Sequence, residues 1–213
     1  MKVRLAWLWL LLGLAPNAGH AQASVTQFHA TADRAGLYQV PGLTPARLGA
    51  LAATPSLSVS VRGLLNAQPL YWQPPDGRNG LIITASEANQ VVALDARTGR
   101  MVWQRTLGPP ASRAGQCGNI DPVGVTATPV IEAASGAIYL DAVIDRQGQQ
   151  TQEIFGLKLG TGANLPGFPL RVRTGLGRLG IGFTDRLQES RSALSLFDGR
   201  LYVAFGGYDG DCG

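Results

Sequence analysis

Charged residues are scarce in this chain of 213 residues, at 15% of the total, and aromatic residues make up only 7%. The low charge disfavours coiled coils, which need charged heptads, while a hydrophobic content of 45% is too high for a disordered chain. Glycine and proline are abundant instead: 28 glycines and 13 prolines account for about one residue in five. The composition therefore favours a compact fold of short elements over a bundle of long helices.

The N-terminal 21 residues have the pattern of a secretory signal peptide. Lys2 and Arg4 precede an apolar run from Leu5 to Leu14, and Gly19-His20-Ala21 supplies the small residues that a signal peptidase requires. The alternative is an uncleaved anchor, but about ten apolar residues would rise only about 15 Å as a helix, half of a bilayer core. We predict cleavage after Ala21, no transmembrane segment in the mature chain, and a periplasmic or secreted location.

Loss of this peptide changes the charge of the chain. Removing Lys2 and Arg4 lowers the formal net charge from +4 to +2, so that the basic excess belongs largely to the targeting signal. A nucleic-acid partner, which needs a concentrated positive face, is not expected.

Export also bears on the two cysteines, Cys117 and Cys212. An even number of cysteines in an oxidising compartment most often forms disulfides, and His29, the only histidine left after cleavage, is too little for a metal site. We predict a disulfide between Cys117 and Cys212, with two unlinked thiols in separate loops as the alternative. The bridge would close a loop of about 95 residues and stabilise the fold by about 4 kcal/mol.

The mature chain divides into two parts. Residues 22–60 have no sustained hydrophobic period and predict an N-terminal strap with one short helix from Leu43 to about Ala53. Residues 61–213 contain short apolar runs bounded by Gly, Pro, Asn and Asp. Three of these runs predict antiparallel strands joined by turns: Leu81–Ala85, Val91–Asp95 and Met101–Thr106.

An internal repeat is the most informative pattern. Ala93–Gly99 recurs as Gly156–Gly162, which places Thr161 and Gly162 63 residues after Thr98 and Gly99. Gly136–Leu140 recurs at the same offset as Gly199–Val203. Each unit consists of a Pro-led strand, a Gly-led strand, a third strand, a Thr-Gly turn and a fourth strand. The second unit also contains a polar insert, Arg146–Gln152, which we predict to be a hairpin loop.

Four short antiparallel strands per repeat are typical of a β-propeller blade, because one such sheet has two faces to bury and blades stack around an axis to bury them. A β-sandwich is the alternative that the strand spacing leaves open. Propellers close with about four to eight blades, whereas this sequence holds two units and the opening strands of a third. We therefore predict an all-β fold, a β-propeller of four-stranded antiparallel blades in an incomplete ring, and a sequence truncated relative to a longer product, with the assembly of several chains into one ring as the alternative.

The residues around the first turn resemble a known family. Asp95, Thr98, Gly99 and Trp103 lie in a pattern, Ala-Leu-Asp-Ala-x-Thr-Gly-x-x-x-Trp, that is similar to the repeat of β-propellers related to pyrroloquinoline quinone (PQQ) enzymes. The resemblance implies that the Gly takes the turn and that the Trp docks against the neighbouring blade. The second unit departs from the pattern, since Pro166 stands at the position that matches Trp103. Three further stretches resemble bacterial secreted propellers described only as quinone-binding-like: Ala67–Trp72, Cys117–Pro122 and Phe205–Tyr208.

Residues suited to PQQ chemistry are few. Enzymes of this type bind a divalent cation, use a catalytic carboxylate and often have two adjacent cysteines, a pair that this chain lacks. Asp209 and Asp211 could approach Ca²⁺, but that ion takes about six to eight oxygen ligands, and a solvated turn is the alternative. Asn119 and Asp121 are expected to form Asx turns, with ligand binding as the alternative. His29 has no nucleophile nearby in the sequence, so a catalytic triad is not predicted.

Five arginines are concentrated in the second half of the chain. They leave two interpretations open, a rim that binds anions at the ends of the blades and a solvated loop between blades. These residues are Arg171, Arg173, Arg178, Arg186 and Arg191.

The pattern as a whole favours an exported propeller of PQQ-like repeat type that binds or scaffolds an unidentified small molecule or protein through loops at one end of the blades. No catalytic or cofactor-binding residue is assigned. One alternative is the N-terminal part of a PQQ-dependent alcohol or sugar dehydrogenase, with PQQ and Ca²⁺ as its cofactors. The other is a scaffold for outer-membrane protein assembly, although the chain has no lipid-attachment Cys near the cleavage site.

The disulfide can be tested by thiol titration. The denatured, unreduced protein, purified after export, should contain no free thiol, because Cys117 and Cys212 are the only cysteines. The same sample after reduction supplies the control value of two thiols, and two thiols without reduction would refute the bridge.

Overall fold

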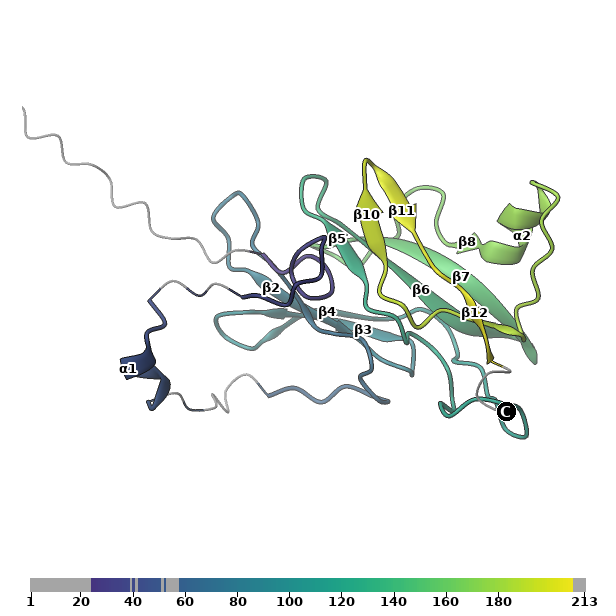
Figure 1. The fold of residues 1–213 in the computed structure, drawn as a ribbon, viewed down its shortest axis with the longest axis horizontal. Helices are drawn as coiled ribbons and strands as arrows, with labels where there is room; N and C mark the ends of the chain where they lie inside the picture. Colours follow the sequence, from purple (N-terminus) through teal and green to yellow (C-terminus); the bar gives the residue numbers. More distant parts are fainter. Residues whose placement is uncertain (1–23, 39, 41, 51, 53–57, 209–213) are drawn as a thin grey trace, which may run out of the picture.

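Two four-stranded antiparallel sheets dominate the computed structural model, which describes residues 24–38, 40, 42–50, 52 and 58–208 (Figure 1). The predicted all-β class is therefore confirmed. The predicted signal peptide, residues 1–21, lies outside the described residues. Within the described part of the chain, no helix is both long enough and apolar enough to cross a membrane.

The first sheet has its four strands in chain order. They are β1 (Leu70–Trp72), β2 (Leu81–Ala85), β3 (Gln90–Asp95) and β4 (Met101–Thr106). The three strands predicted between residues 81 and 106 are confirmed, and only the start of β3 differs, by one residue. A β-bulge between Ala93 and Leu94 leaves Trp103 paired with Ala93 and Met101 paired with Leu94.

The second sheet repeats this order with longer central strands. They are β5 (Val130–Glu132), β6 (Ala137–Arg146), β7 (Gln149–Lys158) and β8 (Leu170–Arg171). The prediction of a hairpin loop over Arg146–Gln152 is wrong, because only Gln147 and Gly148 form the turn and the flanking residues continue the strands. Both turn residues have positive φ, 59° and 82°, as a tight two-residue hairpin turn requires.

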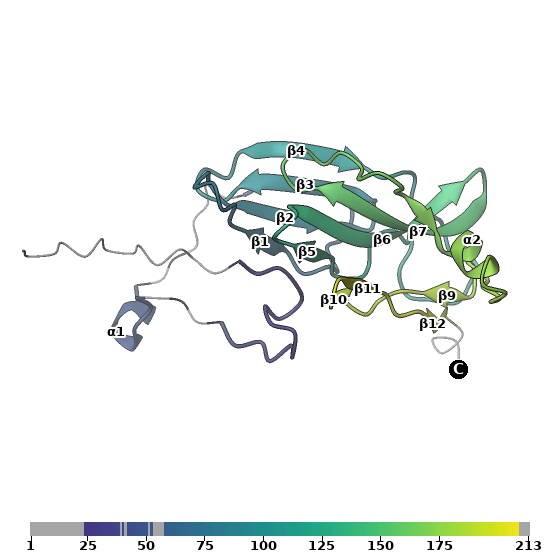
Figure 2. The ribbon, with the colours of Figure 1, turned by 90° about the horizontal axis from the view of Figure 1, so that it is seen from above.

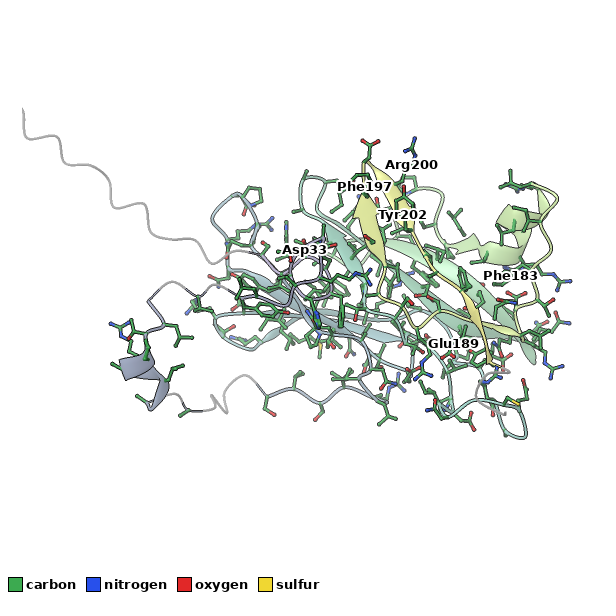
Figure 3. The ribbon with its side chains drawn as sticks, in the orientation of Figure 1. Asp33, Phe183, Glu189, Phe197, Arg200 and Tyr202 are labelled. Atoms are coloured by element: carbon green, nitrogen blue, oxygen red, sulfur yellow. The ribbon has the colours of Figure 1, made fainter. Side chains whose placement is uncertain are left out.

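Two smaller pairs of strands follow. The hairpin of β10 (Ser195–Phe197) and β11 (Arg200–Tyr202) corresponds to the opening strands of a third unit, and β9 (Gln188–Glu189) pairs with β12 (Gly206–Gly207). One face of the hairpin packs through Leu194, Leu196, Leu201 and Val203 against Val130 and Tyr139 of the second sheet. The other face presents Phe197 and Tyr202, which are 69% and 49% exposed (Figure 3).

The main hydrophobic core lies between the two four-stranded sheets (Figure 2). Alternate residues of each strand enter it, such as Leu70 and Ile83 of the first sheet and Ile138 and Leu140 of the second, all at most 2% exposed. Burial of these side chains stabilises each sheet by about 1.5–3 kcal/mol per large apolar residue. The second sheet is thus held between the first sheet and the β10–β11 hairpin.

The two Thr-Gly turns share one backbone geometry. Gly99 and Gly162 both have a φ of 69°, and each donates its N–H at 2.8 Å to the carbonyl oxygen four residues earlier. In the first turn, Asp95 Oδ1 also accepts hydrogen bonds from the Thr98 N–H and hydroxyl, at 2.7 and 2.8 Å. Hydrogen bonds from Asn79 and Thr98 lower the pKa of Asp95 to about 2. Lys158 replaces this Asp in the second turn, so only the backbone part of the motif is repeated.

Trp103 connects the first sheet to the second turn. Its indole N–H donates to the Leu159 carbonyl at 2.7 Å, and its ring lies directly on Gly162. A Cβ added to Gly162 would lie only 2.7 Å from Trp103 Cε3. Glycine is needed at this position both for the positive φ and for the close approach of the indole.

An N-terminal strap runs along the first strands of all three units. Val25 and Tyr71 of β1 exchange two backbone hydrogen bonds, at 2.8 and 3.0 Å. Thr26 O accepts from the Ile131 N–H of β5 at 2.7 Å, and Arg34 Nη2 donates to the Ala193 carbonyl, just before β10, at 2.8 Å.

Two short helices complete the described chain. The helix predicted from Leu43 to about Ala53 is shorter in the structure, where α1 spans Pro45–Leu48 and buries no residue. No tertiary packing therefore offsets the cost of extending it into Gly49. The second helix, α2 (Val172–Gly177), lies just after β8 and was not predicted.

The contact between Trp103 and Gly162 predicts how a methyl group added at residue 162 changes the stability of the fold. Gly162→Ala should lower the free energy of unfolding by about 3 kcal/mol, because the new Cβ meets both the positive φ and the indole ring. Gly148→Ala is the matched control: its φ is 82° but nothing lies within 4 Å of the added Cβ, so we expect a loss of about 1 kcal/mol. Urea unfolding of the two variants measures both values, and equal losses would contradict the docking of Trp103 on the turn.

Candidate functional site

A cluster of buried polar residues lies where the second sheet meets the β2–β3 turn, the loop of residues 107–129 and the β9–β12 pair. Charged side chains are rarely buried so completely unless they are paired or functional. We call this set the polar cluster, and each member is at most 8% exposed: Glu87, Arg113, Asp141, Asp185, Glu189, Ser190 and Tyr208.

Arg113 connects the loop to the rest of the cluster. Its guanidinium donates to the Cys117 carbonyl, from Nε at 2.9 Å and from Nη2, and it lies over the Tyr208 ring with Cζ 3.3 Å from the ring centroid. Its Nη1 also donates to the Arg186 carbonyl at 3.3 Å. The side chain thus ties the loop to the segment that enters β9 and to the end of the described chain.

Glu87 lies in the β2–β3 turn and holds the first sheet to the loop. Its carboxylate accepts hydrogen bonds from Asn66 Nδ2 at 2.7 Å, the Gly124 N–H at 2.8 Å and the Thr126 hydroxyl at 3.2 Å. Burial raises the pKa of Glu87, although these three donors oppose the shift. A Cβ on Gly124 would lie 2.2 Å from the Glu87 carbonyl oxygen, so only glycine allows this approach.

Asp141 lies in the middle of β6, surrounded by otherwise apolar strand residues. Burial raises its pKa to about 7, and the charges of Glu87 and Glu189 add to the shift while the neighbouring Ser190 hydroxyl opposes it. Asp141 Oδ1 is buried without a hydrogen-bond partner among the described residues. A buried oxygen of this kind marks a place for a donor such as an ordered water or a ligand.

The second sheet positions the segment that carries Asp185 and Glu189. The Gln152 N–H donates to Asp185 Oδ1 at 2.8 Å, and Gln152 Nε2 donates to the Gln188 carbonyl at 2.8 Å. Gln150 Nε2 donates to the Asp185 carbonyl at 2.9 Å. These bonds come from the part of β7 that extends beyond the repeat pattern, so the long β6–β7 hairpin builds one wall of the site.

A cleft of about 270 Å³ opens beside the cluster. Its lining combines the carboxylate and guanidinium of Glu189 and Arg191, which are 3.7 Å apart, with the aromatic ring of Phe205 and the backbone of β12. Figure 3 labels Glu189, the acidic residue of this lining. The mixture of both charges, one aromatic face and exposed backbone suits a polar ligand or a peptide segment.

A larger cleft of about 450 Å³ lies at the opposite end of the sheets, near the Thr-Gly turns. Trp72, Arg78, Asp95, Val102 and Gly160 contribute to its walls. The predicted repeat residues Asp95, Thr98, Gly99, Trp103, Thr161 and Gly162 lie at this end, where they form turns and the contact between the sheets.

The loop residues singled out in the sequence lie beside the polar cluster. Asp121 Oδ1 accepts from the Arg113 N–H at 2.8 Å and so fixes the loop, while Asn119 is exposed. Cys117 lies in the same loop, but Cys212 is outside the described residues, so the disulfide stays a prediction. Asp209 and Asp211 also lie outside the described residues.

The remaining candidates do not form one site. His29 stacks on Phe28 with ring centroids 3.9 Å apart, and its Nδ1 lies 3.1 Å from the Arg34 carbonyl. The five arginines divide by role: Arg171 pairs with buried Glu153 at 3.5 Å, and Arg191 pairs with Glu189. The other three, Arg173, Arg178 and Arg186, are exposed.

Sequence reasoning missed the charged members of the polar cluster. Asp141 had a detectable signal, because it interrupts the apolar run of a predicted strand. Glu87 and Arg113 had none, since an acid in a turn and an arginine in a loop are ordinary surface residues. Only the tertiary structure shows that both are buried.

Comparison with known proteins gives no family for this chain. No protein-family model matches it, and no curated protein matches it. Among solved structures, it is similar to the crystal structure of BamB from Moraxella catarrhalis, with 18% sequence identity and a TM-score of 0.23 over 68% of this chain and 48% of that one. The chain therefore spans about half the length of that protein. A likeness at this level carries no argument about the fold or the function of this chain.

Asp141 predicts a pH dependence of stability. Folding raises its pKa from 3.8 to about 7, so the folded state binds this proton more tightly than the unfolded state between those pH values. The free energy of unfolding should therefore fall as the pH rises from about 4 to 7, by up to about 4 kcal/mol. Asp141→Asn should remove most of this fall and stabilise the protein above pH 7.

Asp198→Asn is the matched control, because Asp198 lies in the β10–β11 turn with its side chain 75% exposed. We expect it to leave the pH profile of wild type unchanged in urea unfolding at a series of pH values. A profile for Asp141→Asn that equals that of wild type would show that Asp141 does not bind the proton.

Proposed function

We propose that this chain is an exported binding or scaffolding module, built on a β-propeller of PQQ-like repeat type, which binds a partner at the polar cluster. The repeated geometry supports the propeller. The two four-stranded sheets share their strand order and the backbone of the Thr-Gly turn, and the β10–β11 hairpin packs on the second sheet. The other face of this hairpin exposes Phe197 and Tyr202. Exposed apolar side chains of this kind are typical of a face on which a further sheet packs.

The observation that carries the binding function is the origin of the polar cluster. Its members come from the first sheet, the loop of residues 107–129, the second sheet and the β9–β12 pair, and they meet beside the 270 Å³ cleft. Loops and turns from successive sheets that converge at one end are the usual location of binding sites on a rigid scaffold. Asp141 Oδ1, a buried acceptor of the cluster without a hydrogen-bond partner among the described residues, favours a ligand that carries hydrogen-bond donors.

The alternative of a PQQ-dependent dehydrogenase finds no support in the side chains of this cluster. PQQ enzymes hold Ca²⁺ with several oxygen ligands, and within the described ranges no three His, Cys, Asp or Glu side chains are arranged to hold a metal ion. We therefore derive no chemistry through a quinone or a calcium ion. The role of a scaffold for outer-membrane protein assembly likewise rests on the sequence resemblance.

Photo-crosslinking from the two clefts tests the binding function. A benzophenone side chain at Ser192, in the wall of the 270 Å³ cleft, should give discrete adducts with a partner in the exported fraction of the producing cell. The same side chain at Val102, in the wall of the 450 Å³ cleft, is the control and should give none. Adducts from Val102 and not from Ser192 would place the site at the other end of the sheets.

A different experimental result would overturn the proposal of a binding or scaffolding module. If the protein bound added PQQ and Ca²⁺ saturably and then reduced a redox dye with an alcohol as substrate, the chain would be a dehydrogenase. Such turnover is not expected from the polar cluster, because among the described residues no three His, Cys, Asp or Glu side chains are arranged to hold the Ca²⁺ that a quinone enzyme needs.

A further inference from the structure

The segment from Leu170 to Leu187 projects from the second sheet at the end of the molecule farthest from α1 (Figures 1 and 2). It comprises β8, helix α2 and the turn that follows, and it returns to the polar cluster at Asp185. Both of its ends are held firmly. Leu170 pairs with Ile154 in the sheet, and Asp185 accepts the hydrogen bond from Gln152.

The tip of this projection is an ordered turn. The Ile181 N–H donates to the Leu176 carbonyl at 3.0 Å, and the Gly180 N–H donates to the Gly177 carbonyl at 3.1 Å. With Gly180 at a φ of 73°, these bonds form the Schellman motif that ends many helices. The motif fixes the positions of Leu179 and Ile181 on either side of Gly180.

The projection exposes apolar side chains on a convex surface. Leu179 at the tip is 73% exposed, Ile181 and Leu170 are both 52% exposed, and Leu187 is 48% exposed. Single exposed leucines are common on proteins, but Leu179 and Ile181 place two exposed apolar side chains together at the tip of one short projection. We call residues 170–187 the basic tip, because all of its exposed charged side chains are arginines.

Positive charge surrounds these apolar residues. Neither Arg173 nor Arg178 forms an ion pair among the described residues, and both are exposed. Within residues 170–187 the one acidic residue, Asp185, is buried and accepts from Gln152, and Glu153 in the strand beside the segment is buried and pairs with Arg146 at 2.7 Å and with Arg171 at 3.5 Å. The exposed charge of the basic tip is therefore positive.

We propose that the basic tip docks on an anionic lipid surface. Leu179 and Ile181 would enter the boundary between headgroups and acyl chains, while Arg173 and Arg178 would meet lipid phosphates. A fluid bilayer adapts to a convex projection, whereas a folded protein partner would need a matching groove. The combination of exposed apolar side chains with arginines that form no ion pair among the described residues fits a membrane interface better than a solvated loop. In a solvated loop the exposed leucines would contact only water.

Vesicle flotation tests this proposal with the full chain, purified after export and with its N-terminus determined, because an uncleaved apolar N-terminus would itself bind lipid. The wild type should float with phosphatidylcholine vesicles that contain phosphatidylglycerol, and salt should weaken this binding. Arg173→Gln with Arg178→Gln should lower the affinity about 25-fold, fivefold per arginine. Leu179→Ser with Ile181→Ser should lower it by about tenfold or more.

The matched control combines Arg97→Gln with Met101→Ser, an exposed arginine and a 45% exposed apolar residue on the first sheet. It should bind anionic vesicles like the wild type, and circular dichroism should show that all variants fold. Equal binding to pure phosphatidylcholine, or binding that the tip variants leave unchanged, would overturn the proposal.

An acidic protein surface is the competing partner. Poly-glutamate serves as its probe. If the tip variants lost binding to poly-glutamate while vesicle binding stayed at the wild-type level, the tip would be a protein-docking site and the lipid proposal would be wrong. None of these results depends on the ligand of the polar cluster, so the two proposals fail separately.

Discussion

Each four-stranded sheet of this protein has two faces, and neither sheet can bury both without a neighbour. The rest of the structure depends on this constraint. Leu70 and Ile83 of the first sheet meet Ile138 and Leu140 of the second in one core, and Trp103 packs on Gly162 across the same contact between the sheets. Once the sheets are stacked, their connecting loops are brought to shared ends. The polar cluster and the cleft beside it therefore follow from an apolar contact some distance away.

The charged residues at the two ends of the stacked sheets have different structural roles. At the turn end, Asp95 serves its own turn, and its charge is stabilised locally by backbone and side-chain donors. At the other end, Glu87 and Arg113 each join parts of the chain that are far apart in sequence. Removing a partner from such a buried group leaves a charge without compensation, which costs more than the loss of an exposed contact. The fold therefore depends more on the paired charges at this end than on the charge of Asp95 at the turn end.

The sequence predicted the strands of the first sheet well, because Leu81–Ala85 and Met101–Thr106 are short apolar runs with clear turn residues on both sides. It predicted the Thr-Gly turns as a repeat for the same reason. It failed at Gln149–Gln152, where polar residues extend β7 because they bond to a distant segment rather than to water. It also missed α2, whose glycines disfavour a helix, and Asp141, whose burial depends on neighbours from another part of the chain. In each failure, tertiary contacts outweigh local preference.

The strap carries a consequence for the order of folding. Synthesis delivers Val25 early, yet its partner Tyr71 comes later, and Arg34 bonds to the carbonyl of Ala193, 159 residues further on. Val25 can therefore pair only after Tyr71 has been made, and Arg34 only after Ala193. Contacts of such long sequence separation form slowly, so a product with two stacked sheets would already hold Val25 and Thr26, whereas Arg34 would find its partner only with the third hairpin. The last contact of the strap therefore forms only after most of the chain has been made.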